Sequence, residues 1–315
     1  MRTRAPSVLL LAALGAAPAA AADDDLTLAP LDFHSLPLPE YIQPADAAAG
    51  QPAAEPNKRL RSWELPAITV EGQAPSNLHE EERVGPYGQP RWTATRRFPT
   101  TRVYVIPEGK VEVEGWARGT FLRDKEGGGT EWRFLQEVEI GLPYRFQVDI
   151  YARQDYQTDP DDTLWGGQFE VRWALADWGK LPGNPTLYFE YLTLESRPDR
   201  IEPKLLFGGE IAEGWHWGVN FVGEFELSGE REAEYEMDAG ISYSLIDSVL
   251  AIGVENKYSM SDAHGDRGHF TTEDYVGPSI QWKPIPNLTI NISPLIGVTG
   301  ESAAAQVTFN VGWEF

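Results

Sequence analysis

The stretch VTFNVGWEF, residues 307–315, alternates strictly between two kinds of side chain. Polar or small residues separate its apolar members, which are Val307, Phe309, Val311, Trp313 and Phe315. Because successive side chains of a β-strand point to opposite faces, this pattern predicts a strand with one oily face and one wet face. At the free edge of a soluble sheet, such a strand would expose a hydrophobic row to other chains.

Alternation of the same kind runs through the chain from about residue 109, in segments separated by Gly, Pro, Asp and Asn. The candidate strands are 110–121, 130–141, 145–156, 165–175, 186–195, 204–212, 216–227, 234–245, 249–257, 274–283, 287–294 and 305–315. Their number, about twelve, is even, as bacterial outer-membrane barrels require. Short turns such as LPYR alternate with longer polar connections such as SDAHGDRGHFTT, a pattern typical of periplasmic turns and external loops.

One face of nearly every predicted strand is apolar, while the opposite face is charged. A soluble sandwich or barrel, the alternative architecture, would have to bury that apolar face against a second layer. Lipid is the simplest apolar surrounding, because a closed barrel pairs the backbone N–H and C=O groups that hydrocarbon would leave unsatisfied. The pattern therefore predicts an all-β, antiparallel transmembrane barrel of about twelve strands over residues 101–315.

The aromatic ending of the last strand resembles the closing strand of Gram-negative outer-membrane β-barrels. This resemblance implies that the protein resides in the outer membrane and contacts its lipid. It also implies that Trp313 and Phe315 belong to the signal read by the barrel-insertion machinery, which would be a partner of the unfolded chain.

The amino terminus predicts export. Arg2 and Arg4 precede the apolar run VLLLAALGAAPAA, and small residues lead up to Ala22, so residues 1–22 are predicted to be a signal peptide cleaved after Ala22. The chain contains no Cys, which excludes an acylated cysteine anchor, disulfides and thiolate chemistry. Residues 23–100 are rich in Pro, Ala and charge, which predicts a largely irregular periplasmic extension.

The formal net charge is −22, which argues against nucleic acid as a partner. Acids outnumber bases on the inward parity of the predicted strands, and buried charges must be paired or hydrated. The predicted lumen-lining residues are Glu112, Glu114, Arg118, Glu137, Glu139, Asp149, Arg153, Glu170, Arg172, Glu224, Glu226, Glu236 and Asp238. An acidic, wet lumen predicts a small porin-like channel for small polar solutes or cations. A non-conducting structural or binding barrel, filled by its own charge network, is the alternative.

A single basic island interrupts this acidic chain just before the first predicted strand, at Arg91, Arg96, Arg97 and Arg102. Two interpretations stay open. The island either folds back into the acidic lumen as a partial plug, or it belongs to a solvated periplasmic tail that is free to contact a periplasmic partner.

Catalytic signals are weak, so no enzymatic activity and no cofactor are predicted; an outer-membrane enzyme is the third-ranked alternative. The one dense cluster of metal-ligand types is Asp262, His264, Asp266 and His269 in a predicted external loop, which is either a metal site or simply a solvated loop. Two places fit the barrel poorly. Pro278 cannot donate to a ladder, so a bulge or register shift is expected there. The run TLYFEYLTL, residues 186–194, is apolar on both parities, which leaves its inward face open.

Overall fold

The computed structural model describes residues 77–156 and 163–315. The predicted signal peptide and most of the predicted extension lie outside these residues. None of the helices in the described part of the chain is long and apolar enough to cross a membrane. These helices are the short 3-10 turns η2 (His79–Glu81), η3 (Arg91–Thr93), η4 (Asp124–Glu126), η5 (Pro143–Arg145) and η6 (His264–Asp266).

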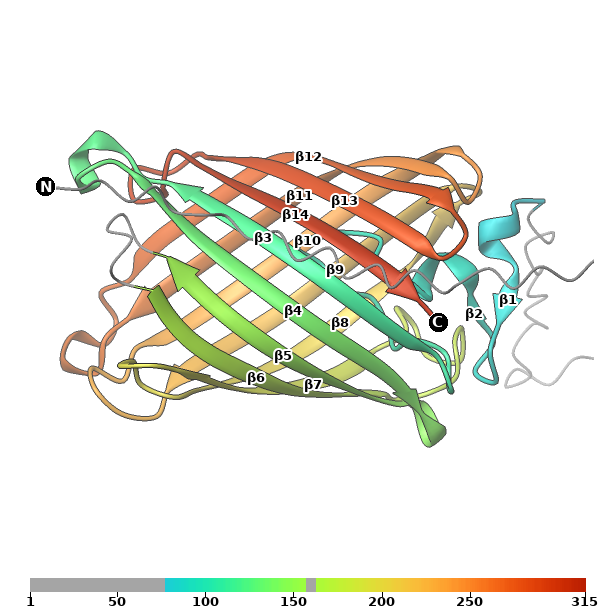
Figure 1. Cartoon of the computed structure of the whole chain (residues 1–315), viewed down its shortest axis with the longest axis horizontal. Helices are drawn as coiled ribbons and strands as arrows, with labels where there is room; N and C mark the ends of the chain where they lie inside the picture. Colours follow the sequence, from blue (N-terminus) through green and yellow to red (C-terminus); the bar gives the residue numbers. More distant parts are fainter. Residues whose placement is uncertain (1–76, 157–162) are drawn as a thin grey trace, which may run out of the picture. The chain divides into compact units, whose positions relative to one another are not determined.

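Twelve antiparallel strands close into a barrel in which β14 pairs with β3, so the predicted architecture is confirmed (Figure 1). The strands are β3 (Val111–Phe121), β4 (Thr130–Leu142), β5 (Phe146–Tyr156), β6 (Thr163–Ala174), β7 (Thr186–Leu194), β8 (Arg200–Ala212), β9 (Trp215–Glu226), β10 (Ala233–Ile246), β11 (Leu250–Asp262), β12 (Thr271–Ile285), β13 (Leu288–Gly297) and β14 (Ala305–Glu314). Before the barrel, β1 (Arg83–Val84) and β2 (Gln89–Pro90) form a two-stranded ribbon.

The outer face of the barrel is apolar, as the alternation predicts. Large hydrophobic side chains are exposed on it, among them Ile150 at 54%, Phe169 at 49% and Phe221 at 50%. Their strand neighbours point inward, and Asp149 and Glu170 are fully buried. Since closure leaves no free sheet edge and the exterior is suited to hydrocarbon, the fold is that of a membrane-spanning barrel.

The two ends of the barrel differ. At the end where β3 begins and β14 finishes, here called the terminal end, the turns 143–145, 213–214, 247–249 and 286–287 are short, and only 175–185 is longer. At the opposite loop end, the described connections 122–129, 195–199, 227–232, 263–270 and 298–304 are mostly longer. This is the asymmetry that the connection lengths predict.

The inward face of β7, which the sequence leaves open, is decided by the structure. Tyr188, Glu190 and Leu192 are buried, whereas Phe189 and Tyr191 are exposed. The ammonium of Lys204 lies 4.3 Å from the ring centre of Tyr188, and the Tyr188 hydroxyl donates to Glu190. Tyr188 therefore faces the charged interior, where its ring and its hydroxyl both find polar partners.

The prediction of a bulge or register shift at Pro278 is wrong. The pairing of β12 with β13 has one register from Tyr275 opposite Gly297 to Trp282 opposite Ile290, and it shifts only beyond Trp282. Around Pro278, paired residues are missing only on the β13 side, where Pro294 also lacks a donor. A hydroxyl donates to the Pro278 carbonyl there, from Ser293 at 3.4 Å. A local gap in the ladder thus accommodates the missing N–H without a shift.

Candidate functional site

The chain enters the lumen before it builds the wall. Residues 78–110 are here called the luminal segment. The β1–β2 ribbon lies beyond the strand ends at the terminal end of the barrel (Figure 1), and the buried residues that follow it lie inside the barrel. Phe98 and Val105 are fully buried, and Tyr104 is 1% exposed. The longer turn 175–185 contributes Trp178, whose ring centre lies 5.8 Å from that of Trp92 and 5.2 Å from that of Tyr104. The segment therefore has an apolar core of its own, shared with this turn.

Glycines in the wall make room for the luminal segment. A Cβ atom at Gly240 would lie 2.7 Å from Cδ1 of Phe98, and one at Gly218 would lie 2.7 Å from Cγ2 of Val103. These glycines occupy inward positions of β10 and β9, where any larger side chain would take the space of the segment. The wall and the segment are thus complementary in shape.

Arg96 lies in the middle of the carboxylates of β3 and β4. Its guanidinium is 3.1 Å from Glu114, 3.2 Å from Glu139 and 3.6 Å from Glu137, and it lies 4.2 Å from the ring centre of Trp116. Burial by itself would lower the pKa of Arg96, but these carboxylates raise it above the ordinary arginine value. Arg96 therefore stays charged and neutralises part of the acidic wall.

The other basic residues of the island differ in their surroundings. Arg102 is buried and donates to Glu139, so it joins the same carboxylate cluster. Arg97 is buried on the opposite wall, where it donates to Ser242 at 3.0 Å and Gln281 at 3.1 Å. Arg91 is the exception, because its side chain is 40% exposed and its ion pair is with Glu82, 3.4 Å away.

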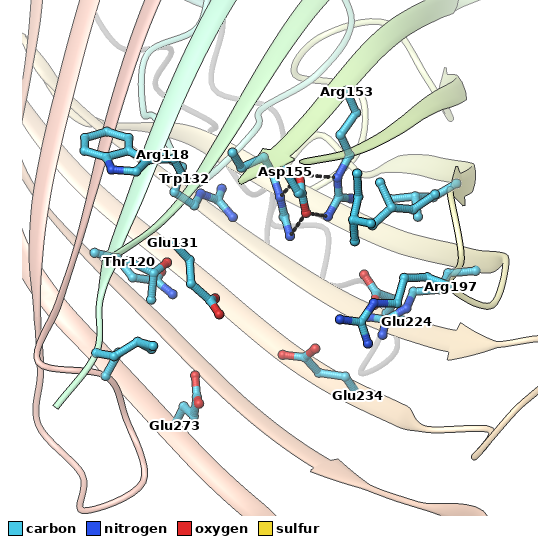
Figure 2. A pocket seen from close by; sticks show the side chains of 18 of the residues that line it. Arg118, Thr120, Glu131, Trp132, Arg153, Asp155, Arg197, Glu224, Glu234 and Glu273 are labelled. Atoms are coloured by element: carbon cyan, nitrogen blue, oxygen red, sulfur yellow. Dashed lines mark hydrogen bonds and ion pairs between the residues drawn. The ribbon is translucent and has the colours of Figure 1, made fainter. Parts of the chain in front are cut away.

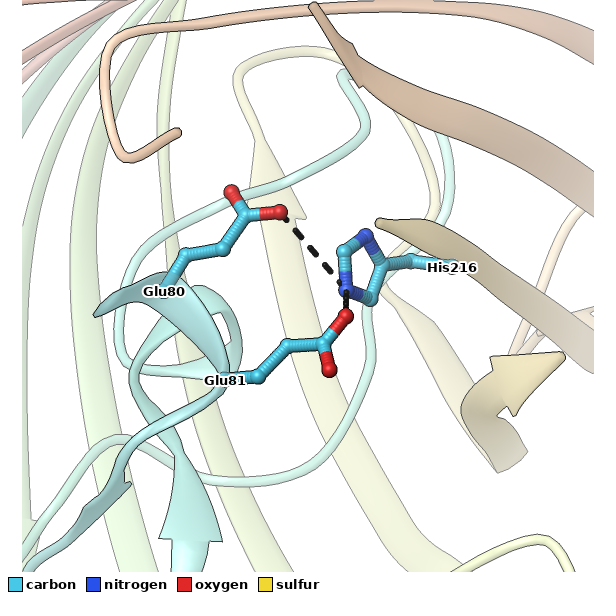
Figure 3. Close-up of side chains that lie close together, drawn as sticks. All are labelled: Glu80, Glu81 and His216. Atoms are coloured by element: carbon cyan, nitrogen blue, oxygen red, sulfur yellow. Dashed lines mark ion pairs between the residues drawn. The ribbon is translucent and has the colours of Figure 1, made fainter. Parts of the chain in front are cut away.

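Arg97 also organises a histidine that sequence reasoning missed. It donates to Nδ1 of His216 at 2.9 Å and to Glu80 at 3.2 Å, and burial lowers the pKa of Arg97 despite the nearby carboxylates. Nε2 of His216 faces two carboxylates, 3.5 Å from Glu81 and 3.8 Å from Glu80 (Figure 3).

Glu80, Glu81 and His216 have potential ligand atoms close enough together to hold a metal ion. However, a nitrogen that accepts from Arg97 forces the proton of a neutral imidazole onto Nε2, and a protonated nitrogen cannot bind a metal. His216 therefore connects the luminal segment to β9 through its contacts with Glu80, Glu81 and Arg97.

Side chains of the wall also hold the backbone of the luminal segment. The Gln281 amide donates to the Arg96 carbonyl at 2.5 Å, and the Thr100 amide donates to Glu255 at 2.7 Å. The Ile106 amide donates to Gln147 at 2.7 Å. A stretch without regular secondary structure can be buried only if its backbone groups find partners, and here the strands supply them.

Beyond the luminal segment, the lumen is hollow. A cavity of about 830 Å³ lies toward the loop end (Figure 2). A second cavity of about 260 Å³ shares lining residues with it. Charged residues that line both cavities are Arg118, Arg133, Arg153, Arg200 and Lys257, together with Glu224 and Glu234. The five basic residues of this set are here called the basic collar. The junction of the cavities is therefore rich in basic groups, although the chain as a whole is acidic.

The predicted lumen-lining residues all occupy the inward parity of their strands. Glu112, Glu114, Glu137, Glu139, Asp149, Arg153, Glu170, Arg172 and Asp238 are buried, and Arg118, Glu224, Glu226 and Glu236 are partly buried. Several wall residues that contact the luminal segment through polar groups were not predicted, among them His216, Glu255 and Gln281. Each has inward parity, which is a usable signal, but parity cannot indicate which inward residues meet the segment.

The predicted metal-ligand cluster lies in the loop between β11 and β12. There, Asp262 accepts from Arg267 and from the Gly268 amide, and Asp266 contacts His269 at 2.5 Å. Among the described residues, this loop does not bring three potential ligand atoms within metal-binding distance of one another. At the terminal end, Trp313 is 41% and Phe315 is 69% exposed. The role of Trp313 and Phe315 in insertion stays a prediction.

Comparison with known proteins agrees with the fold. No family model and no curated protein matches the sequence. An outer membrane channel from Pseudomonas putida F1 is 6% identical, with a TM-score of 0.52 over 67% of this chain and 97% of that one. The NanC porin is 15% identical, with a TM-score of 0.46 over 65% of this chain and 98% of its own. The translocator domain of the autotransporter NalP from Neisseria meningitidis is 10% identical, with a TM-score of 0.43 over 65% and 88%. At 6% identity, the likeness to the Pseudomonas channel shows the β-barrel fold alone.

Proposed function

We propose that the protein is a porin-like channel for small polar solutes, with the luminal segment as a partial plug at the terminal end. One observation carries this proposal: Arg96 lies among Glu114, Glu137 and Glu139 with its guanidinium buried. A segment that is held by charges and fits a glycine-lined groove occupies the space through which solutes would otherwise pass.

The size of the barrel supports a solute path. Eight-stranded barrels are filled by side chains and sixteen-stranded porins are open, so twelve strands leave an intermediate interior. In this barrel the interior beyond the luminal segment forms the two adjoining cavities of about 830 and 260 Å³. Their walls are polar and charged, which favours water and small polar solutes over apolar ones.

The cation preference predicted from the sequence follows for the barrel without its plug. Arg96 and Arg102 lie against a buried carboxylate cluster in the terminal half, which consists of Glu112, Glu114, Glu137, Glu139, Asp149 and Glu170. Once those two arginines leave, Arg172 is the ion-pair partner that remains for Asp149 and Glu170. Rings of carboxylates favour cations, so the unplugged channel should be cation-selective.

Planar bilayer recordings test the proposal with two deletions. Removing residues 23–100 takes away most of the luminal segment, including Arg96 but not Arg102. This deletion should raise the single-channel conductance and shift the reversal potential toward cation selectivity. Removing residues 23–76 keeps the luminal segment and should leave the conductance of the full chain unchanged. Equal conductance in all three proteins would contradict the plug.

The alternative is a barrel that is closed for good and serves as a structural or binding protein. The dense contacts of the luminal segment favour it, since Phe98 and Val105 are fully buried. A silent bilayer with both the full chain and the 23–100 deletion, at high protein load and with folded barrels verified by gel migration before and after heating, would favour this alternative.

A further inference from the structure

The basic collar contains two arginines, Arg118 and Arg133, that are less closely paired with carboxylates than its other members. Arg153 donates to Asp155 through two nitrogens, at 2.9 and 2.7 Å, and Arg200 is paired with Glu226 at 2.8 Å. Lys257 is paired with Glu236. Three of the five collar residues therefore have close carboxylate partners.

Arg118 and Arg133 are left with little compensation. Arg133 reaches the carboxylate of Asp155 only at 3.4 to 3.5 Å, and Arg153 already engages that carboxylate at shorter distances. Arg118 makes no hydrogen bond or ion pair with any residue that the structure describes. Arg133 and Arg153 thus share the one carboxylate of Asp155, and Arg118 does not contact it.

The strand register places Arg118 and Arg133 side by side. Arg118 on β3 is the direct cross-strand partner of Arg133 on β4, and both point inward. Like charges in directly opposite positions destabilise a sheet, so the pair is unfavourable unless an anion lies between or against them. Figure 2 shows Arg118, Arg153 and Asp155 at the edge of the larger cavity.

We propose that Arg118 and Arg133 bind the anionic group, a carboxylate or a phosphate, of a small solute in the larger cavity. Asp155 fixes Arg153 beside them and so completes the positive wall. Guanidinium forks match the paired oxygens of both anions, and their donors remain available here. The proposal rests on the proposed channel function, because it assigns the solute class of that same lumen.

The carboxylate cluster of the terminal half differs from the basic collar in the source of its counter-charge. It receives arginines from within the chain, since Arg96 and Arg102 bind there. None of the described residues of the luminal segment lines the larger cavity, and the wall carboxylates Glu131 and Glu234, which do line it, have no ion pair with Arg118 or Arg133. The counter-charge of this pair is therefore expected from the solute.

Equilibrium binding to the full chain in detergent tests the proposal, because it does not depend on whether the barrel conducts. Sodium phosphate and sodium succinate are titrated by calorimetry in sodium chloride at constant ionic strength, since screening changes with salt. The native protein should bind at least one probe saturably. Arg118→Gln and Arg133→Gln should each weaken that binding by about tenfold or more, as expected for the loss of a charge-assisted contact.

Arg197→Gln is the matched control. Arg197 lines the same cavity outside the collar, and the substitution removes the same charge, so binding should not change. Absence of saturable binding by the native protein, or native affinity in Arg118→Gln, would overturn the proposal. Preference for phosphate assigns phosphorylated solutes, and preference for succinate assigns organic acids. A silent bilayer alongside intact anion binding would reject the channel while leaving this site in place.

Discussion

On β3, β4 and β5, carboxylates face the terminal half of the lumen and arginines face the junction of the two cavities, although the same strands build both regions. Along β3, Glu112 and Glu114 at the terminal end give way to Arg118. The neighbouring strands repeat the change, from Glu137 and Glu139 to Arg133 on β4 and from Asp149 to Arg153 on β5.

The two regions differ in how their buried charges are compensated. The acidic half is complemented by arginines from the luminal segment, whereas Arg118 and Arg133 lack such a partner among the described residues. The two proposals assign different roles to these regions: the carboxylates hold the luminal segment, and the arginines bind a solute.

Reversing the charge of Arg96 should have the largest effect on this contrast. Arg96→Glu places a carboxylate against Glu114, Glu137 and Glu139, and breaking a buried ion pair costs about 3–5 kcal/mol. We expect the luminal segment to leave the lumen, measured as faster proteolysis of residues 78–110 and higher conductance. Arg91→Glu, at an exposed position, should leave both unchanged. Equal protection of the segment in the two variants would remove the basis for charge-held closure.

The inward and outward assignment on which the comparison depends can be tested from the lipid side. Phe221 is 50% exposed on the outer face of β9. Phe221→Arg should destabilise the folded barrel by about 2–4 kcal/mol if this residue faces the middle of the bilayer. Urea unfolding in lipid vesicles measures the change, and a negligible effect would mean that the parity is misassigned.

The fit between the luminal segment and the wall can be weakened without changing any charge. Gly240→Val places atoms where Phe98 now lies, and overpacking costs about 1–3 kcal/mol. The segment should be released less completely than in Arg96→Glu, with an intermediate rise in proteolysis. Gly115→Ala on β3, where nothing lies within 4 Å, is the control. Similar proteolysis of both glycine variants would indicate that shape contributes little.

The smallest expected effect concerns the arginine pair of the collar. Arg118→Gln removes a like-charge contact with Arg133, so the barrel should become more stable, by about 0.5 kcal/mol. Chemical unfolding without added anion measures it. Addition of a binding anion should stabilise the native protein and reduce the difference in unfolding free energy between it and Arg118→Gln. A loss of stability in Arg118→Gln would indicate that the protein itself compensates the charge of Arg118.

Much of the fold was predictable because alternation is a local property. The predicted strand 110–121 differs from β3 by one residue, and the aromatic terminal strand predicted at 305–315 is β14. Inward parity for Glu112 or Asp149 follows from the same period of two. The site was harder to predict, since His216 and Gln281 acquire their meaning only from Arg97, which is far away in the sequence.

The sequence by itself determined the barrel, the lipid-facing side of nearly every strand and the inward placement of its charges, because a period-two pattern allows only one face to meet hydrocarbon. Only the tertiary structure decided that Tyr188 and Leu192 face inward and that Pro278 needs no register shift. It also brought Arg96 to Glu114 and Arg118 to Arg133. The physical reason is that closure and register pair residues that are distant along the chain, and these pairings determine which buried charges are compensated.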